Sequence, residues 1–164
     1  MYNYGCAMDR DPGLDLVTAV HLGGLALVAE SLRRLHAAGF PDLRTSHGFV
    51  IQHVVEGPRT AGEMARRMGI SQQGASKAVG ELVRLGYLER TPAPGDARVR
   101  LVGLSARGWE AVRTTRRLRA EVEAELVEVL GPDRAAALHR AALAALEWAG
   151  GAPAVRERRV PGPG

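Results

Sequence analysis

The chain has 164 residues, 46% of them hydrophobic, which is long enough for one domain with a core or for a small domain with long helical extensions. Two Phe, two Trp and three Tyr are too few for stacking single-stranded nucleic acid, while a single cysteine excludes an internal disulfide framework and suits a reducing cytoplasm. Residues 1–11 lack the basic and apolar regions of a signal peptide, and no apolar run approaches the roughly 20 residues of a membrane span, so we expect a cytoplasmic protein without membrane contact.

The net charge of +4 is concentrated in one part of the chain. Residues 44–101 hold nine basic and five acidic residues, whereas the remaining residues hold 13 of each sign. A localised positive field suits a phosphate backbone, because neutralised phosphates release counterions. The excess of arginine over the one lysine, Lys77, also fits a GC-rich genome, but such a genome does not explain where the imbalance lies.

Residues 14–38 and 43–55 are predicted to form the first two helices. Apolar residues in the first recur by threes and fours, which is the spacing of a seam against another helix. The seam positions are Leu14, Val17, His21, Leu25, Val28, Leu32 and Leu35. Gly39-Phe-Pro-Asp breaks the first helix, and Gly57-Pro58 ends the second.

Residues 60–86 have the pattern of two short helices joined by a tight turn, which is typical of a helix-turn-helix. Thr60 and Glu63 have the spacing of a capping box, so the first helix should begin at residue 61. Gly69 can supply a left-handed turn residue, and Ser71 can cap the second helix. The apolar positions predicted to face the core in that second helix are Ala75, Ala78, Val79, Leu82 and Val83.

Residues 87–91 and 98–104 are predicted to be strands joined by the turn cluster Pro92-Ala-Pro-Gly-Asp. A hairpin directly after a recognition helix is a wing. Ser105 should cap a helix over 106–130, and Gly131-Pro132-Asp133 should end it and start another that runs to about residue 149. The order predicts a mainly α fold of six helices with a small β-hairpin wing.

The long helices at both ends carry apolar stripes that a single winged module does not need for its own core. We expect them to form a mutual interface in a homodimer, because an amphipathic stripe left in water would be an exposed patch. The expected organisation is an N-terminal dimerisation helix (14–38), a DNA-binding lobe (43–104), C-terminal dimerisation helices (105–149) and flexible ends (1–13 and 150–164).

Four segments stand in a fixed order: Leu43-Arg-Thr-Ser-His-Gly-Phe-Val-Ile, Met64-Ala-Arg-Arg-Met-Gly-Ile-Ser-Gln-Gln-Gly-Ala-Ser-Lys-Ala-Val, Leu85-Gly-Tyr-Leu-Glu-Arg and Asp96-Ala-Arg-Val-Arg-Leu-Val-Gly-Leu-Ser-Ala-Arg-Gly. With this order and spacing the chain resembles the MarR (multiple antibiotic resistance regulator) family of transcription factors over roughly residues 14–148. The resemblance implies a regulator, more commonly a repressor, that binds double-stranded DNA at a pseudo-palindrome and responds to a small apolar or phenolic effector. It also implies that Asp96 holds Arg98 in the minor groove.

The residues predicted to contact DNA lie early in the recognition helix and in the wing. They are Ser71, Gln72, Gln73, Ser76, Lys77, Asp96, Arg98 and Arg100. One alternative is that these side chains form only a solvated helix face. Another is a winged protein-interaction module that does not bind DNA, which would have an exposed apolar recognition helix and a neutral wing. Gly74 and Gly80, unusual in a helix, would either permit close packing or leave the helix soft until DNA binds.

Other residue patterns predict no further chemistry. The five histidines have no tight metal-ligand spacing, and no nucleophile elbow, phosphate loop or zinc-protease motif occurs, so we expect neither an enzyme nor a cofactor or metal. Cys6 would be a peroxide sensor only if its thiol pKa were lowered, and an unreactive thiol is the simpler interpretation.

Overall fold

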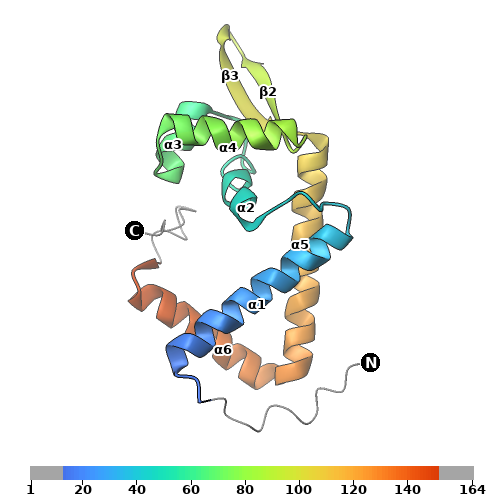
Figure 1. The fold of residues 1–164 in the computed structure, drawn as a ribbon, viewed down its shortest axis with the longest axis vertical. Coiled ribbons are helices and arrows are strands. Elements are labelled where there is room, and N and C mark those ends of the chain that lie inside the picture. The colour runs from blue at the N-terminus through green and yellow to red at the C-terminus, as the bar shows by residue number, and fades with distance from the viewer. Residues whose placement is uncertain (1–12, 152–164) are drawn as a thin grey trace. The chain divides into compact units, whose positions relative to one another are not determined.

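The computed structural model describes residues 13–151, so Cys6 and most of the two expected flexible ends lie outside the described residues. The elements in chain order are α1 (Leu16–Ala37), α2 (Thr45–Ile51), β1 (Arg59–Thr60), α3 (Ala61–Met68), α4 (Gln72–Arg84), β2 (Leu88–Ala93), β3 (Asp96–Leu104), α5 (Ala106–Leu130) and α6 (Pro132–Trp148). The predicted mainly α fold with a hairpin wing is confirmed (Figure 1). The chain comprises two compact units, residues 1–30 and 31–164.

The first unit contains the N-terminal part of α1. Asp15 stabilises the start of this helix, because its carboxylate accepts hydrogen bonds from the backbone and the hydroxyl of Thr18 at 3.0 and 2.7 Å. The side chains of Leu16 and Val17 are 79% and 78% exposed. By length and composition alone, the 22-residue α1 could cross a membrane. The expectation that no apolar segment is long enough to span a membrane was therefore wrong, because few polar residues interrupt α1. An apolar helix that packs against protein has the same composition.

The described residues of the second unit form one hydrophobic core, built by the last turns of α1, α2 with its flanking segments, the helix-turn-helix, the sheet and the first half of α5. Its fully buried large side chains are Val54, Met64, Val79, Leu82, Tyr87 and Val102. Arg34 on α1 forms a two-pronged ion pair with Glu125 on α5, at 2.7 and 2.6 Å. Helix α4 lies across the base of the hairpin, and α5 leads away from that base (Figure 1).

The sheet has three antiparallel strands in the order β1-β3-β2, so the predicted hairpin gains a third strand that the sequence analysis missed. Strand β2 also continues through Pro92 to Ala93, which reduces the predicted turn cluster to Pro94 and Gly95. Proline is tolerated there because β2 is an edge strand, where its missing N–H removes no ladder bond. Pro92 pairs with Arg100, and the register shifts directly after it.

Helix α2 is shorter than predicted, since only Thr45–Ile51 is α-helical. The chain beyond it still turns, but with tighter bonds: the N–H groups of His53 and Val54 donate three residues back, to the carbonyls of Val50 and Ile51. The apolar residues that predicted a longer helix do face the core, since Val54 is almost fully buried.

Helix α5 begins in close contact with the connection between α4 and β2. The backbone N–H of Ser105 donates to the carbonyl of Tyr87 at 3.1 Å, and the Ser105 hydroxyl donates to the carbonyl of Gly86 at 2.6 Å. A Cβ on Gly108 would lie 2.1 Å from that same Tyr87 carbonyl oxygen. Only glycine therefore allows α5 to approach this closely.

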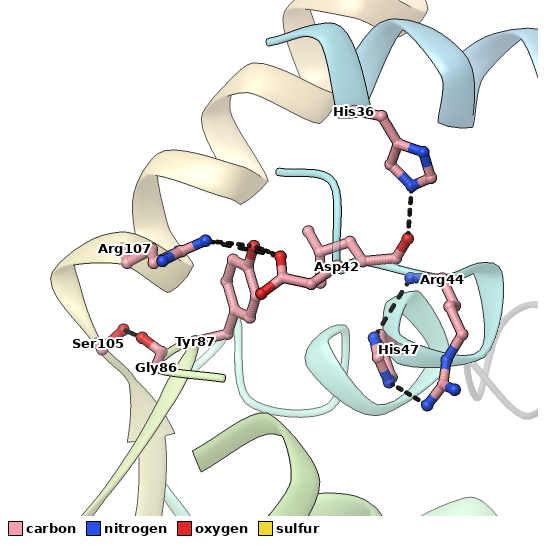
Figure 2. A network of polar contacts seen from close by, with 9 residues as sticks. His36, Asp42, Arg44, His47, Gly86, Tyr87, Ser105 and Arg107 are labelled. Atoms are coloured by element: carbon pink, nitrogen blue, oxygen red, sulfur yellow. Dashed lines mark hydrogen bonds and ion pairs between the residues drawn. The ribbon is translucent and has the colours of Figure 1, made fainter. Parts of the chain in front are cut away.

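Three side chains join the same region to the chain that precedes α2. The Tyr87 hydroxyl donates to the Asp42 carboxylate at 2.5 Å, and the Arg107 guanidinium donates to the Tyr87 hydroxyl at 3.2 Å and lies 3.5 Å from Asp42 (Figure 2). We call Asp42, Tyr87 and Arg107 the junction cluster. The hydrogen bond from Tyr87, followed by the charge of Arg107, holds the pKa of Asp42 below its ordinary value although burial opposes the shift.

Gly108 and Gly80 should respond oppositely to alanine. Gly108→Ala should lower the free energy of unfolding by about 2 kcal/mol or more, because the new methyl group meets backbone rather than a movable side chain. Gly80→Ala in α4 meets nothing within 4 Å, so better helix propensity should raise the free energy by about 0.5–1 kcal/mol. Urea unfolding followed by circular dichroism measures both, and a Gly108→Ala variant as stable as the parent would contradict the close approach.

The stability of Tyr87→Phe should depend less on acid than that of the parent. A lowered folded-state pKa of Asp42 adds stability above the unfolded-state pKa, and this stability is lost as the pH falls through the folded value. Removing the hydroxyl removes the main cause of the shift. Between pH 7 and about pH 3 the unfolding free energy should fall less for the variant, as urea titrations at both pH values would show. Equal losses would show that the Tyr87–Asp42 bond does not form.

Candidate nucleic-acid interface

The capping box predicted at the start of α3 is present. The Thr60 hydroxyl accepts from the Glu63 N–H at 3.2 Å, and the Glu63 carboxylate accepts from the Thr60 N–H at 2.7 Å. These bonds from Thr60, first from its backbone and then from its hydroxyl, lower the pKa of Glu63. The reciprocal bonds fix the residue at which α3 begins. They therefore also fix where α3 ends and where the turn to α4 starts.

The turn between α3 and α4 has the predicted geometry. Gly69 adopts the left-handed conformation at φ 69°, and the Ser71 hydroxyl accepts from the backbone N–H of Gly74 at 3.1 Å. A Cβ on Gly74 would lie 3.2 Å from that hydroxyl, so at this position glycine makes room for the cap. At Gly80 nothing lies within 4 Å, and close packing does not account for that glycine.

Helix α4 presents two different faces. Its inner face holds Ala75, Val79 and Leu82, all completely buried. On its outer face Gln72, Gln73, Ser76 and Lys77 are exposed, and within residues 13–151 none of these side chains has a hydrogen-bond or ion-pair partner. Ser71 is exposed too, but its hydroxyl already caps the helix. The first two turns of α4 thus offer amide, hydroxyl and ammonium groups to a ligand.

A second contact fastens α4 to α2. Glu81, on the half-buried side of α4, forms an ion pair with Arg44 and lies 3.6 Å from Nε2 of His47. His47 is buried, and its Nδ1 accepts from the backbone N–H of Arg44 at 3.2 Å (Figure 2). Burial raises the pKa of Glu81, but Arg44 and His47 together outweigh it and lower the pKa. The orientation of α4 is therefore fixed by polar contacts as well as by packing.

The wing carries three exposed arginines. The register pairs Arg90 of β2 with Val102, two positions beyond Arg100, so Arg90 and Arg100 share a face, whereas Arg98 lies where the pairing shifts, between Arg100 and Asp96. Sequence analysis missed Arg90, because only the strand register shows which face it occupies.

Asp96 contacts the backbone of Arg98 in the chain without DNA. Its carboxylate accepts from the backbone N–H of Arg98 at 2.9 Å, and no Asp96–Arg98 ion pair occurs among the described residues. The aspartate shapes the start of β3 after the turn at Gly95. The guanidinium of Arg98 is left exposed in solution.

Two arginines near α3 already have partners inside the chain. Arg59 donates to the carbonyl of His53 at 2.7 Å and contacts Glu56 at 3.4 Å, and Arg67 lies 4.0 Å from the same carboxylate. Within the described part of the chain, no group of three or more His, Cys, Asp or Glu residues could hold a metal ion. Arg59 and Arg67 are thus engaged within the chain, whereas the polar side chains on the outer face of α4 have no partner among the described residues.

The sequence model of the MarR family matches residues 42–99. A helix-turn-helix type transcriptional regulator of Mycobacterium leprae is 34% identical over 92 residues, which cover 56% of this chain and 64% of that protein. Similarly named proteins of Mycobacterium bovis and Mycobacterium tuberculosis are 35% identical over 75 residues, 46% of this chain and 52% of theirs. The chain thus spans between half and two thirds of these relatives, whose names are those of regulators and not of enzymes.

Solved structures show the same fold. RV1404 of Mycobacterium tuberculosis superposes with a TM-score of 0.69 at 22% identity, over 86% of this chain and 97% of that one. MarR of E. coli in its apo form gives 0.56 at 21% identity over 81% and 98%. FabT of Streptococcus pneumoniae, solved in complex with DNA, gives 0.63 at 17% identity over 80% and 92%. The family model over residues 42–99, the named relatives and the shared fold together make this chain similar to proteins of the MarR family.

Proposed function

We propose that this protein is a transcriptional regulator that binds specific sequences in double-stranded DNA. The observation that carries the proposal is the outer face of α4, where four exposed polar side chains without partners stand beside a wing that bears three arginines. A recognition helix in the major groove uses such side chains at its N-terminal end. The structures of FabT and of a MepR mutant from S. aureus, both solved with DNA, support this use of the shared fold.

Each proposed contact follows from the chemistry of its side chain. Gln72 and Gln73 can read adenine through paired hydrogen bonds, and Lys77 can donate to guanine. Arg98 enters the minor groove, where its charge meets the densest negative potential. Ser71 and Ser76 approach phosphates at the start of α4, Arg100 contacts the backbone beside the wing, and Asp96 orders the strand that carries both arginines.

A homodimer is the form in which the protein acts. Helix α6 has no buried residue, and its Leu138, Leu143 and Trp148 are 48%, 53% and 90% exposed. The apolar face of α1 is similarly uncovered. A second copy that covers α1, α5 and α6 would remove these surfaces from water and place two recognition helices on one face of a pseudo-palindrome. Residues 14–38 and 105–149 would then be dimerisation helices, and 43–104 the DNA-binding lobe.

Repression follows if the dimer occludes a promoter. A small apolar or phenolic effector bound between the dimerisation helices and the DNA-binding lobe would change the spacing of the recognition helices. Such a coupling is typically worth about 1–3 kcal/mol between effector and DNA. The same outer face of α4 could instead bind protein, and the DNA measurements below decide between these functions.

The chain should sediment as a dimer at micromolar concentration. The expected mass is about twice 17.5 kDa, since the apolar faces of α1 and α6 are too large to remain in water. Analytical ultracentrifugation over a dilution series measures it. A monomer whose preferred DNA site contains a single half-site would contradict the dimer.

Alanine substitutions should distinguish residues that recognise the DNA sequence from residues that add affinity for any DNA through their charge. Gln73→Ala and Lys77→Ala should each weaken binding to the selected site by about 1–3 kcal/mol and affect random DNA much less, because base contacts are lost. Arg98→Ala should weaken binding to most sequences and reduce the salt slope by roughly one unit. Its effect should add to that of Lys77→Ala, because the two side chains lie in different grooves.

Fluorescence anisotropy over a salt series, with selected and scrambled duplexes, measures these effects. Arg116→Ala is the matched control, because it removes one positive charge from an exposed arginine on α5, away from α4 and the wing, and sedimentation checks that this variant remains a dimer like the parent. If all three test variants bind like the parent, α4 and the wing do not read DNA and the protein-binding function takes their place.

A further inference from the structure

We infer that the junction cluster of Asp42, Tyr87 and Arg107 is a positioning device that sets the angle between the recognition helix and α5, and thereby the half-site spacing that the dimer selects. The inference rests on the proposed function for its DNA-binding consequence. The angular part concerns one protomer alone and can be tested without DNA. None of the three side chains lies on the outer face of α4 or on the wing.

Tyr87 moves with the recognition helix. Its backbone N–H donates to the carbonyl of Leu82 in the last turn of α4 at 2.9 Å. Its ring is completely buried, and the ring centroid lies 6.2 Å from that of Phe40. The Tyr87 side chain therefore follows any movement of α4. Its ring stays in the core, and its hydroxyl contacts Asp42 and Arg107, which lie outside α4.

Arg107 moves with α5, because it is the second residue of that helix. Its guanidinium lies 4.8 Å above the centre of the Tyr87 ring, donates to the hydroxyl at 3.2 Å and stands 3.5 Å from Asp42. A cation on the face of the ring and a hydrogen bond at its edge fix direction as well as distance. A rotation of α5 against α4 has to break one of these contacts.

Asp42 supplies the fixed point. It precedes α2 in the connection from α1, and the carbonyl of the next residue, Leu43, accepts from Nε2 of His36 near the end of α1 at 2.7 Å (Figure 2). The following residue, Arg44, is joined to Glu81 of α4. The two residues that follow Asp42 are therefore held by α1 and α4, which fixes the backbone that carries the carboxylate and closes a loop of contacts around the start of α5.

The length of α5 converts a small angle into a large displacement. Its 25 residues extend for about 37 Å at 1.5 Å per residue. A rotation of roughly 5° at the junction therefore moves the far end by about 3 Å, which is close to the 3.4 Å rise of one DNA base pair. Since α5 is a proposed dimerisation helix and the same rotation occurs in both protomers, it changes the separation of the two recognition helices on the scale of about one to two base-pair steps.

Tyr87→Phe tests the inference, because it keeps the buried ring and removes only the hydroxyl. Thr115→Val is the matched control: its hydroxyl donates to the Ala111 carbonyl at 2.8 Å within α5 and links no second element. In a Cys6→Ser background, spin labels at Ser76→Cys in α4 and Ala124→Cys in α5 report the distance between the helices without DNA. Labelled chains are diluted with unlabelled ones, so that distances within one protomer dominate.

The expected result is a broader or shifted distance distribution for Tyr87→Phe and for Asp42→Asn, and a parental one for Thr115→Val. On duplexes whose half-site separation differs from the optimum by one or two base pairs, the parent's preference for the optimum should fall at least threefold in Tyr87→Phe. Affinity for a single half-site should stay within twofold of the parent. A loss of stability alone would not change this ratio.

A parental distance distribution in both junction variants overturns the inference, whatever happens to DNA binding. A changed distribution with an unchanged spacing preference overturns its DNA-binding consequence. A parent protein that binds none of the duplexes overturns the proposed function and that consequence together, while the distance measurement still decides whether the cluster positions α5.

Discussion

The carbonyl of Tyr87 is the point at which three elements of the molecule are joined. This carbonyl oxygen accepts a hydrogen bond from the backbone N–H of Ser105, and it leaves no room for a Cβ on residue 108. The backbone N–H of Tyr87 donates in turn to the carbonyl of Leu82 in the last turn of α4. Helix α4, the hairpin and α5 can therefore adopt only a narrow range of mutual orientations. The core then fills the space that these backbone contacts define, with Leu82 and Val102 completely or almost completely buried beside the junction.

The charges of residues 44–101 divide into two groups. Arg44, Arg59 and Arg67 meet carboxylates of Glu56 and Glu81, so they neutralise acids within the lobe and hold its elements together. Lys77, Arg98 and Arg100 have no such partner in the part of the chain that the structure describes. The ion pairs of Glu56 and Glu81 thus engage arginines inside the lobe, while the charges of Lys77, Arg98 and Arg100 remain available on α4 and the wing.

Short sequence patterns correctly predicted features that depend on neighbouring residues. They failed for features that depend on contacts between residues far apart in the sequence. The caps at Thr60, Ser71 and Ser105 were correct, because a cap depends on one side chain and a backbone N–H three residues further on. Strand β1 is only two residues long and exists because Val102 and Leu101 of β3 pair with it, so no periodicity could reveal it. The face shared by Arg90 with Arg100 depends on strand register, and the Tyr87–Asp42 bond joins residues 45 positions apart. The predicted DNA contacts themselves remain a prediction.

Both borders of the sheet are unsuited to accept another strand. One border is β1, which offers a single pair of residues, and the other is β2, where Pro92 lacks an N–H and the register shifts beside it. Uninterrupted edge strands recruit neighbouring chains and lead to aggregation. A hairpin that projects into solvent with one flat edge would carry that risk in every copy of the protein. Pro92, which has no N–H to donate to a further strand, therefore disfavours pairing between the free edge of the wing and another chain, even at the high protein concentration of a cell.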